Sequence, residues 1–206
     1  MADGGVVREA FQFASSDGAS TIHGTIWWPA GIAQDGDEKP SPRGVVQLVH
    51  GMAEHISRYD DFACFLCAQG FVVAGHDQIG HGDSCDPAKW GCLPMRGGAD
   101  FLIGDVDKVR AIVSARVAPD TPYVIFGHSL GSFITRCYIA RHGAGLAAAI
   151  ICGTGSLAPS KANAARNLSS FIGFFRGEDH KSKFVDGMGV GAYAKALPDR
   201  KTDLDW

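Results

Sequence analysis

The sequence contains no long hydrophobic run and no excess of basic charge. No apolar stretch approaches the roughly 20 residues of a membrane-spanning helix, and residues 1–18 lack the apolar core and basic flank of a signal peptide. Lysines and arginines number 19 against 22 aspartates and glutamates, which is unlike a nucleic-acid-binding stripe or a polybasic membrane tether. We therefore expect a cytoplasmic protein without a nucleic-acid partner, and leave peripheral contact with membranes open.

Patterns typical of disulfide-rich or zinc-binding domains are also missing. Cys64 and Cys67 match C-x-x-C, but no second ligand pair follows at zinc spacing. Cys85 and Cys92 share a loop and could pair only under oxidising conditions. We expect buried, small hydrophobic roles for the cysteines in apolar segments, namely Cys64, Cys67, Cys137 and Cys152, and we expect neither a metal nor a cofactor.

Apolar runs that alternate with helical patterns are present. Such alternation predicts an α/β fold with a mostly parallel, doubly wound sheet whose strands are covered on both faces. Two further segments, FQFASS and TIHGTIWWP, predict antiparallel strands at its N-terminal side. The predicted parallel strands are residues 43–51, 71–77, 123–129 and 146–153, and the helices are residues 57–70 and 99–117.

The character of the chain changes after residue 155. Residues 156–206 are loop-rich and mixed in polarity, with Ala165, Leu168, Ile172 and Phe175 on one predicted helical face. This segment is interpreted either as the start of a helical cap over a site or as a helix packed on the core. A cap with an apolar face could also rest against a membrane surface.

The stretch GHSLG, residues 127–131, places a serine between a buried strand and a helix. The bare G-x-S-x-G pattern occurs often by chance, but this context is typical of a strained elbow that exposes a nucleophile. We predict that Ser129 is that nucleophile, and that the helix behind it buries Leu130, Phe133, Ile134 and Cys137.

A second stretch, HGMAEH, follows the first parallel strand at residues 50–55. A tetrahedral oxyanion needs two donors aimed at one point. We expect one to be the N–H of Leu130 and the other to come from this loop. The alternative is an ordinary strand-to-helix turn with two solvated histidines.

Taken together, HGMAEHISRY, HDQIGHGDS and FGHSLGS resemble the monoglyceride lipase and lysophospholipase branch of the α/β-hydrolases, also described as serine aminopeptidase S33-like. The resemblance covers residues 20–155 well and the remainder loosely. It implies backbone oxyanion donors at Met52 and Leu130, and a structural loop beside the site that contains Asp77, Gly80, His81, Gly82 and Ser84. It also implies that Glu54, His55 and Arg58 organise the oxyanion loop.

The base that Ser129 needs is not evident. In this fold an acid and then a histidine follow the serine, but only His142 and His180 do so. His142 lies at the far end of the same predicted helix, roughly 20 Å away, and nothing places His180 near the serine. We therefore interpret residues 1–155 as the N-terminal part of a hydrolase core and residues 156–206 as a cap, with the strands that carry the acid and the base absent. The exposed apolar edge at 146–153 supports this interpretation. A further segment or a second chain would complete the site.

The sequence thus predicts a serine hydrolase that cleaves lipid-like esters, either monoacylglycerols or lysophospholipids, through an acyl-enzyme on Ser129. One alternative is a non-catalytic or truncated hydrolase scaffold that binds a ligand or partner. Another is a nucleotide-dependent oxidoreductase, suggested by GTGSLA at residues 153–158 with Glu178 beyond it.

Overall fold

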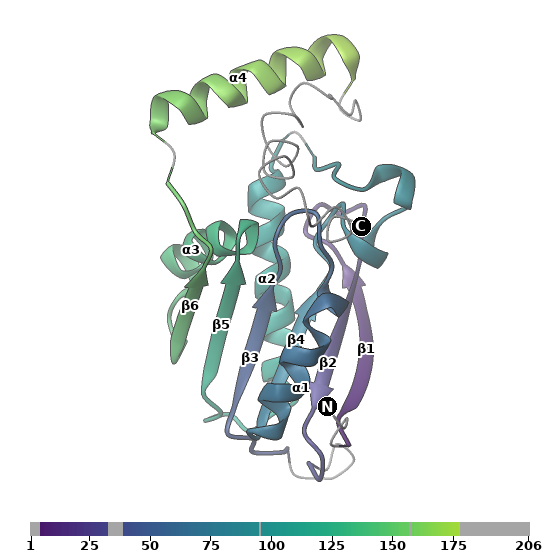
Figure 1. Cartoon of the computed structure of the whole chain (residues 1–206), viewed down its shortest axis with the longest axis vertical. Helices are drawn as coiled ribbons and strands as arrows, with labels where there is room; N and C mark the ends of the chain where they lie inside the picture. The colour runs from purple at the N-terminus through teal and green to yellow at the C-terminus, as the bar shows by residue number, and fades with distance from the viewer. Residues whose placement is uncertain (1–4, 33–38, 95, 157, 178–206) are drawn as a thin grey trace, which may run out of the picture.

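A mixed sheet forms the centre of the chain in the computed structural model, which describes residues 5–32, 39–94, 96–156 and 158–177. Its strands lie in the order β1-β2-β4-β3-β5-β6 (Figure 1). The β1–β2 and β2–β4 pairs are antiparallel, and the other pairs are parallel, as predicted. The strands are β1 Val7–Ala14, β2 Thr21–Trp28, β3 Gly44–Val49, β4 Phe71–His76, β5 Tyr123–His128 and β6 Ala148–Cys152.

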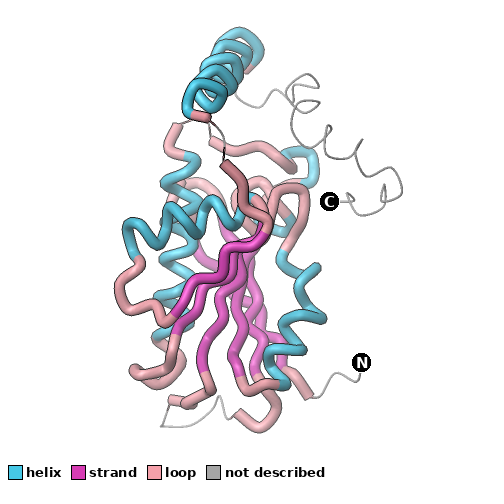
Figure 2. The backbone as a smooth tube through the Cα atoms, turned by 60° about the vertical axis from the view of Figure 1, so that its left-hand side comes forward, coloured by secondary structure: helices cyan, strands magenta, loops and turns pink. Residues whose placement is uncertain are grey.

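Helices cover both faces of this sheet (Figure 2). Helix α1 (Asp60–Ala68), which follows a short 3-10 turn at Ile56–Tyr59, lies on one face, and α2 (Gly98–Ser114) and α3 (Leu130–His142) lie on the other (Figure 1). Side chains of β3 alternate between the two layers, since Val46 and Leu48 pack toward α1 while Val45 and Val49 pack toward α2 and α3. A strand buried on both faces is nearly all apolar, which explains the apolar run, and the one polar residue of β3, Gln47, donates a hydrogen bond to the Val106 carbonyl.

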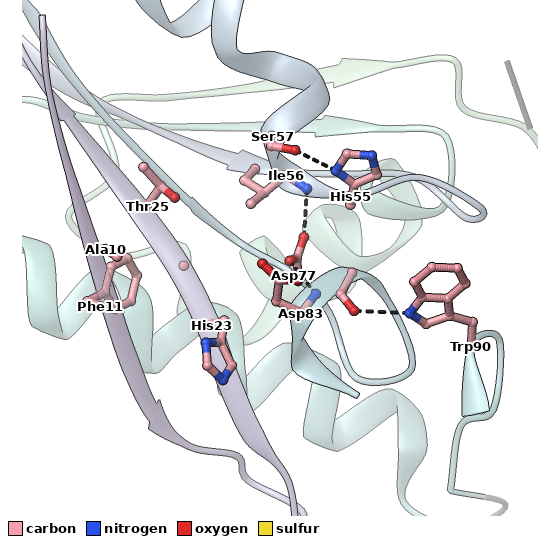
Figure 3. Close-up of a pocket in the computed structure, with 12 residues that line it drawn as sticks. Ala10, Phe11, His23, Thr25, His55, Ile56, Ser57, Asp77, Asp83 and Trp90 are labelled. Carbon is pink, nitrogen blue, oxygen red and sulfur yellow. Dashed lines mark hydrogen bonds between the residues drawn. The ribbon is translucent and has the colours of Figure 1, made fainter. Parts of the chain in front are cut away.

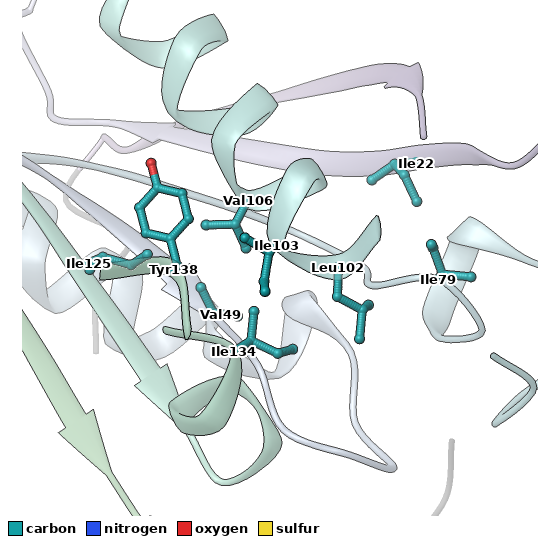
Figure 4. Packing of buried hydrophobic residues seen from close by; sticks show 9 residues of the cluster. All are labelled: Ile22, Val49, Ile79, Leu102, Ile103, Val106, Ile125, Ile134 and Tyr138. Carbon is teal, nitrogen blue, oxygen red and sulfur yellow. The ribbon is translucent and has the colours of Figure 1, made fainter. Parts of the chain in front are cut away.

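The core beneath the carboxyl end of the sheet is formed where α2 and α3 meet β3 and β5 (Figure 4). Every member of this cluster is at most 6% exposed. Burial of this extent fixes the two helices on the sheet, because each buried aliphatic side chain contributes roughly 1.5–3 kcal/mol. The cluster comprises Ile22, Val49, Ile79, Leu102, Ile103, Val106, Ile125, Ile134 and Tyr138.

Residues 146–153 have the composition of a central strand, but in the described part of the chain they form the exposed apolar edge that was expected from the sequence. β6 lies at the edge of the sheet, and its Ile150 is 48% exposed. Its apolar composition matches a central strand, but no described strand pairs with its outer edge. Cys152, expected to be buried, is therefore exposed.

Two helices turn few large apolar side chains toward the sheet. Helix α1 turns the small residues Ala63 and Cys67 to the sheet, while Phe62 and Phe65 are 37% and 54% exposed. The adjacent Trp27 is fully buried and fills the space that larger helix residues would need. Phe62 and Phe65 of α1 therefore lie outside the core, whereas Tyr59 and Leu66 pack against its edge.

Helix α3 buries Ile134 as predicted, but Phe133 and Cys137 are exposed and Leu130 is only partly buried. Its sheet-facing side consists largely of small or polar residues because the helix approaches β3 closely. The buried residues of α3 are Gly131, Ser132, Ile134, Thr135 and Tyr138.

Helix α4 (Pro159–Arg176) runs across the carboxyl edge of the sheet, away from the strands (Figure 1). On its predicted apolar face, Ala165 is exposed and Leu168 and Phe175 are 36% and 67% exposed. The structure therefore does not support packing of this face on the core, and a cap remains a prediction. None of the described helices has the length and hydrophobicity of a membrane span. His180 and Glu178 lie outside the described residues.

Buried histidines predict that this fold loses stability in mild acid. His76 is 1% exposed, and its ring nitrogens have no hydrogen-bond partner among the described residues. Burial lowers the pKa of His76 from 6.5 to about 4. Between these values the unfolded chain binds a proton that the folded chain excludes. The free energy of unfolding should therefore be highest above pH 6.5 and fall by about 3 kcal/mol as the pH approaches 4.

Urea unfolding at pH values between 7.5 and 4.5 would measure this loss. Burial also lowers the pKa values of His50 and His81, so they contribute with the same sign. Relative to the wild type, His76→Leu should show a drop smaller by the share of one histidine, whereas His142→Leu, at an exposed position, should not. An identical drop in His76→Leu would show that the acid lability arises elsewhere.

Candidate functional site

Three loops meet at one edge of the sheet. Because β3, β4 and β5 run parallel and lie side by side, the segments that follow them leave from the same edge. These segments are residues 50–55 after β3, residues 77–84 after β4, and the turn at residue 129 after β5. The three motifs identified in the sequence therefore come together in space.

Ser129 forms the turn between β5 and α3 in a left-handed backbone conformation, with φ 50° and ψ −116°. Such a conformation costs a residue with a β-carbon about 1–3 kcal/mol and is concentrated at functional sites. Space requires the glycines on either side, because a Cβ on Gly127 would lie 2.4 Å from the Gly131 carbonyl oxygen, and one on Gly131 would lie 1.9 Å from that of Val49. The sharp bend is present, and the nucleophilic role of Ser129 remains a prediction.

The loop after β3 touches this bend. A Cβ on Gly51 would lie 3.1 Å from Ser129 Cβ, and the Gly51 N–H donates a hydrogen bond to Glu54 Oε1. Ala53 has φ 60° and is, with Ser129, one of two described non-glycine residues with positive φ. Both strained residues of the described chain thus lie in adjoining loops at this edge.

Two backbone amides are available beside the bend. Leu130 is the first residue of α3, so its N–H has no acceptor within the helix. Neither the Leu130 nor the Met52 amide has a hydrogen-bond acceptor among the described residues. The N–H of Ser129 itself is occupied, since it donates to the Cys152 carbonyl at 3.0 Å. Both amides are thus available, and the role of Met52 and Leu130 as oxyanion donors stays a prediction.

The loop after β4 is held by Asp77. Its carboxylate accepts the Ile56 N–H at 2.7 Å and the Asp83 N–H at 2.9 Å, while its backbone carbonyl accepts the Ser84 hydroxyl at 2.7 Å. A Cβ on Gly82 would lie 2.2 Å from Asp77 Oδ2. Burial raises the pKa of Asp77, and the hydrogen bonds from Ile56 and Asp83 oppose that shift. These contacts agree with the structural role that the sequence implied for this loop.

His50 is a structural residue in the described chain. Its Nδ1 lies 2.7 Å from the Gly51 carbonyl and its Nε2 accepts the Gln78 N–H at 3.0 Å. These contacts fix the neutral tautomer that is protonated on Nδ1, and complete burial lowers the pKa well below 6.5. With both ring nitrogens occupied, His50 is not placed to accept a proton from a serine.

A general base for Ser129 is not found among the described residues. No histidine nitrogen forms a hydrogen bond with Ser129 Oγ in residues 5–32, 39–94, 96–156 and 158–177. His142 ends α3 and lies beside Asp107 of α2. His128 is adjacent in sequence, but its Nδ1 contacts Glu54 at 3.2 Å.

A cavity of about 340 Å³ lies elsewhere, between β1, β2 and the loops after β3 and β4 (Figure 3). Its lining includes His23, His55, Ser57, Asp83 and Trp90 but not Ser129. Ser57 Oγ lies 2.6 Å from His55 Nδ1, so a serine–histidine contact exists away from the bend. The described residues contain no cluster of three or more histidine, cysteine or acidic side chains that could hold a metal ion.

The resemblance implied that Glu54 organises the loop after β3, but sequence reasoning missed the contact between Glu54 and His128. Its Oε1 accepts the Tyr59 hydroxyl at 2.8 Å and lies close to both Gly51 N and His128 Nδ1. Burial, followed by the nearby Glu54 charge, raises the pKa of Tyr59. The glutamate was visible in the motif, but nothing in the linear sequence placed His128 beside it.

Comparison with known proteins gives consistent relatives. A family model described as "Serine aminopeptidase, S33" matches residues 40–185. The monoacylglycerol lipase of Mycolicibacterium smegmatis is 32% identical over 148 residues, which is 71% of this chain and 46% of that protein. The monoglyceride lipase of Mus musculus is 30% identical over 99 residues, or 47% of this chain and 31% of that protein. The chain thus spans less than half the length of these curated relatives.

Solved structures show the same arrangement. A thermostable carboxyl esterase from Bacillus coagulans, in complex with glycerol, superposes with a TM-score of 0.78 and 33% identity over 97% of this chain and 61% of that one. A lipase in its open form has a TM-score of 0.77 at 24% identity, covering 96% of this chain and 61% of its own. The second likeness shows the fold alone, which is that of the α/β-hydrolases.

Proposed function

Because this chain belongs to the serine aminopeptidase S33 family of α/β-hydrolases, we propose that it carries the nucleophile and the oxyanion donors of an ester hydrolase. The observation that carries the proposal is the left-handed Ser129 at the turn into α3, in contact with the glycine loop after β3. In a nucleophile elbow, a strained backbone conformation at the serine exposes its hydroxyl above the sheet, where a substrate can reach it. Neither of the two neighbouring amides has an acceptor among the described residues.

In the proposed reaction, Ser129 Oγ attacks the acyl carbonyl carbon while its proton passes to a base. The carbonyl oxygen gains negative charge and is stabilised by the N–H groups of Met52 and Leu130, since preorganised donors of this kind commonly supply about 2.7–4 kcal/mol each. The base returns the proton to the leaving alcohol, and water then cleaves the acyl-enzyme. The base and its carboxylate partner come, in this proposal, from outside the described residues.

The proposed substrates are lipid-like esters. Support comes from relatives named as monoacylglycerol and monoglyceride lipases and from a structural neighbour named as a carboxyl esterase. The exposed Leu168, Phe171 and Phe175 on α4 would offer apolar surface to an acyl chain. Within this class we propose monoacylglycerols or lysophospholipids, which share one acyl ester and differ in the head group.

Mapping of the serine that a fluorophosphonate modifies, by phosphonylation with loss of fluoride, tests the proposal. The protein is treated with a fluorophosphonate, digested, and analysed by mass spectrometry for the modified peptide. We expect one adduct, on Ser129. An adduct on Ser57, whose hydroxyl contacts His55, would place the active centre in the cavity between β1, β2 and the loops after β3 and β4. A natural protein that forms no adduct would instead support the non-catalytic scaffold, which the lack of a described base favours.

A further inference from the structure

One carboxylate oxygen joins several parts of the site. Glu54 Oε1 accepts the N–H of Gly51 within its own loop and the hydroxyl of Tyr59 at 2.8 Å, and His128 Nδ1 lies 3.2 Å from it. The Glu54 side chain is 13% exposed. An ionised carboxylate only accepts hydrogen bonds, so in this pair Nδ1 of His128 carries the proton and donates it.

His128 sits directly before the bend. Its ring lies between Glu54 on one side and Gly153 on the other, where a Cβ would be 3.4 Å from the ring atoms Cδ2 and Nε2. The ring therefore spans from the end of β5 to the loop after β3. That loop carries the Met52 amide, whereas β5 leads into Ser129 and the Leu130 amide.

We propose that His128 is a positioning residue, which aligns the Met52 amide with Ser129 and Leu130 by donating from Nδ1 to Glu54. The inference rests on the proposed function, because alignment matters only if the two amides act together on an oxyanion. Loss of the contact would leave the loop attached through Gly51 and Tyr59 but free to shift relative to the bend. Displacements near 1 Å at such sites cost up to about 100-fold in rate.

Two substitutions separate the hydrogen bond from the bulk of the ring. Asparagine at position 128 can place an amide N–H near the position of Nδ1, whereas leucine keeps the volume and removes the donor. The maximal rate of phosphonylation by the fluorophosphonate, kinact, is measured separately from the binding constant KI. We expect His128→Leu to lower kinact by about 10- to 100-fold with KI within about twofold, and His128→Asn to stay within about threefold of the wild type in kinact.

His142 provides the matched control, because its side chain is 41% exposed against 42% for His128 and lies 3.8 Å from the Asp107 carboxylate. His142→Leu should be phosphonylated at the wild-type rate. Urea unfolding of all three variants at pH 7.5 should show that lost stability does not explain lost rate.

If kinact of His128→Leu matches the wild type, or if His128→Asn is as slow as His128→Leu, this inference fails, while phosphonylation of wild-type Ser129 still supports the proposed function. If wild-type Ser129 is not phosphonylated, both the inference and the proposed function fail.

Discussion

Replacement of Ser129 by alanine should abolish phosphonylation by a fluorophosphonate and lower ester hydrolysis by the natural protein by about 10⁴-fold or more. Loss of a catalytic serine removes the covalent route entirely, and what remains comes from substrate binding and the oxyanion donors. The free energy of unfolding should stay within about 0.5 kcal/mol of the wild type, since alanine keeps the β-carbon at φ 50° and no described residue is hydrogen-bonded to Ser129 Oγ.

Glycine at the same position gives an independent check on strain. Ser129→Gly should be equally inactive but more stable than Ser129→Ala by about 1 kcal/mol, because glycine adopts positive φ without the steric cost. Equal stability of the two variants would mean that the bend stores no strain. Ser57→Ala is the matched control, since it removes a serine that contacts a histidine away from the bend, and it should be phosphonylated as fast as the wild type. Retained phosphonylation in Ser129→Ala would falsify the proposed function.

Replacement of Gly131 by alanine should destabilise the fold by about 3 kcal/mol or more. The added Cβ would lie 1.9 Å from the Val49 carbonyl oxygen and 2.6 Å from that of His50. Both atoms belong to the backbone at the end of β3, so neither can rotate away as a side chain would. Relief requires α3 to move off the sheet, which would expose part of the cluster that contains Ile134 and Tyr138.

Gly98→Ala is the appropriate comparison for Gly131→Ala. Gly98 is the first residue of α2, as Gly131 is the second residue of α3, but a Cβ on Gly98 would have no neighbour within 4 Å. That variant should be as stable as the wild type or slightly more stable, because alanine favours the helix. Urea unfolding of both variants measures the difference. Equal midpoints for Gly131→Ala and the wild type would show that α3 does not depend on this close approach.

The sheet was predictable because its strands are encoded locally. Runs such as GVVQLV are almost entirely apolar, as expected of a strand covered on both faces, with the buried Gln47 as the exception. The bend at Ser129 was predictable for the same reason, since a glycine-flanked serine between a strand and a helix has few other conformations. The contact between the loop after β3 and this bend then followed from parallel neighbouring strands.

The buried faces of α1 and α3 were not predictable from hydrophobicity alone. Ala63 and Cys67 face the sheet, and Phe62 lies outside against Phe126, with ring centroids 5.5 Å apart. How closely a helix approaches a sheet depends on the volumes of both partners, such as Trp27 beneath α1. The link between Glu54 and His128 was equally hidden, because the two residues belong to different strand–helix units.

The bend at Ser129 is positioned by main-chain atoms on three sides. Carbonyl groups of Val49 and His50 adjoin Gly131, and the carbonyl of Cys152 receives the Ser129 N–H. Every amino acid supplies a carbonyl, so these particular contacts do not depend on the side chains at residues 49, 50 and 152, although the buried Val49 and His50 have side-chain roles of their own. Positions 127 and 131 are more restricted, since a Cβ at either one would lie too close to backbone atoms. Substitutions at these two glycines should therefore be the least tolerated next to the serine.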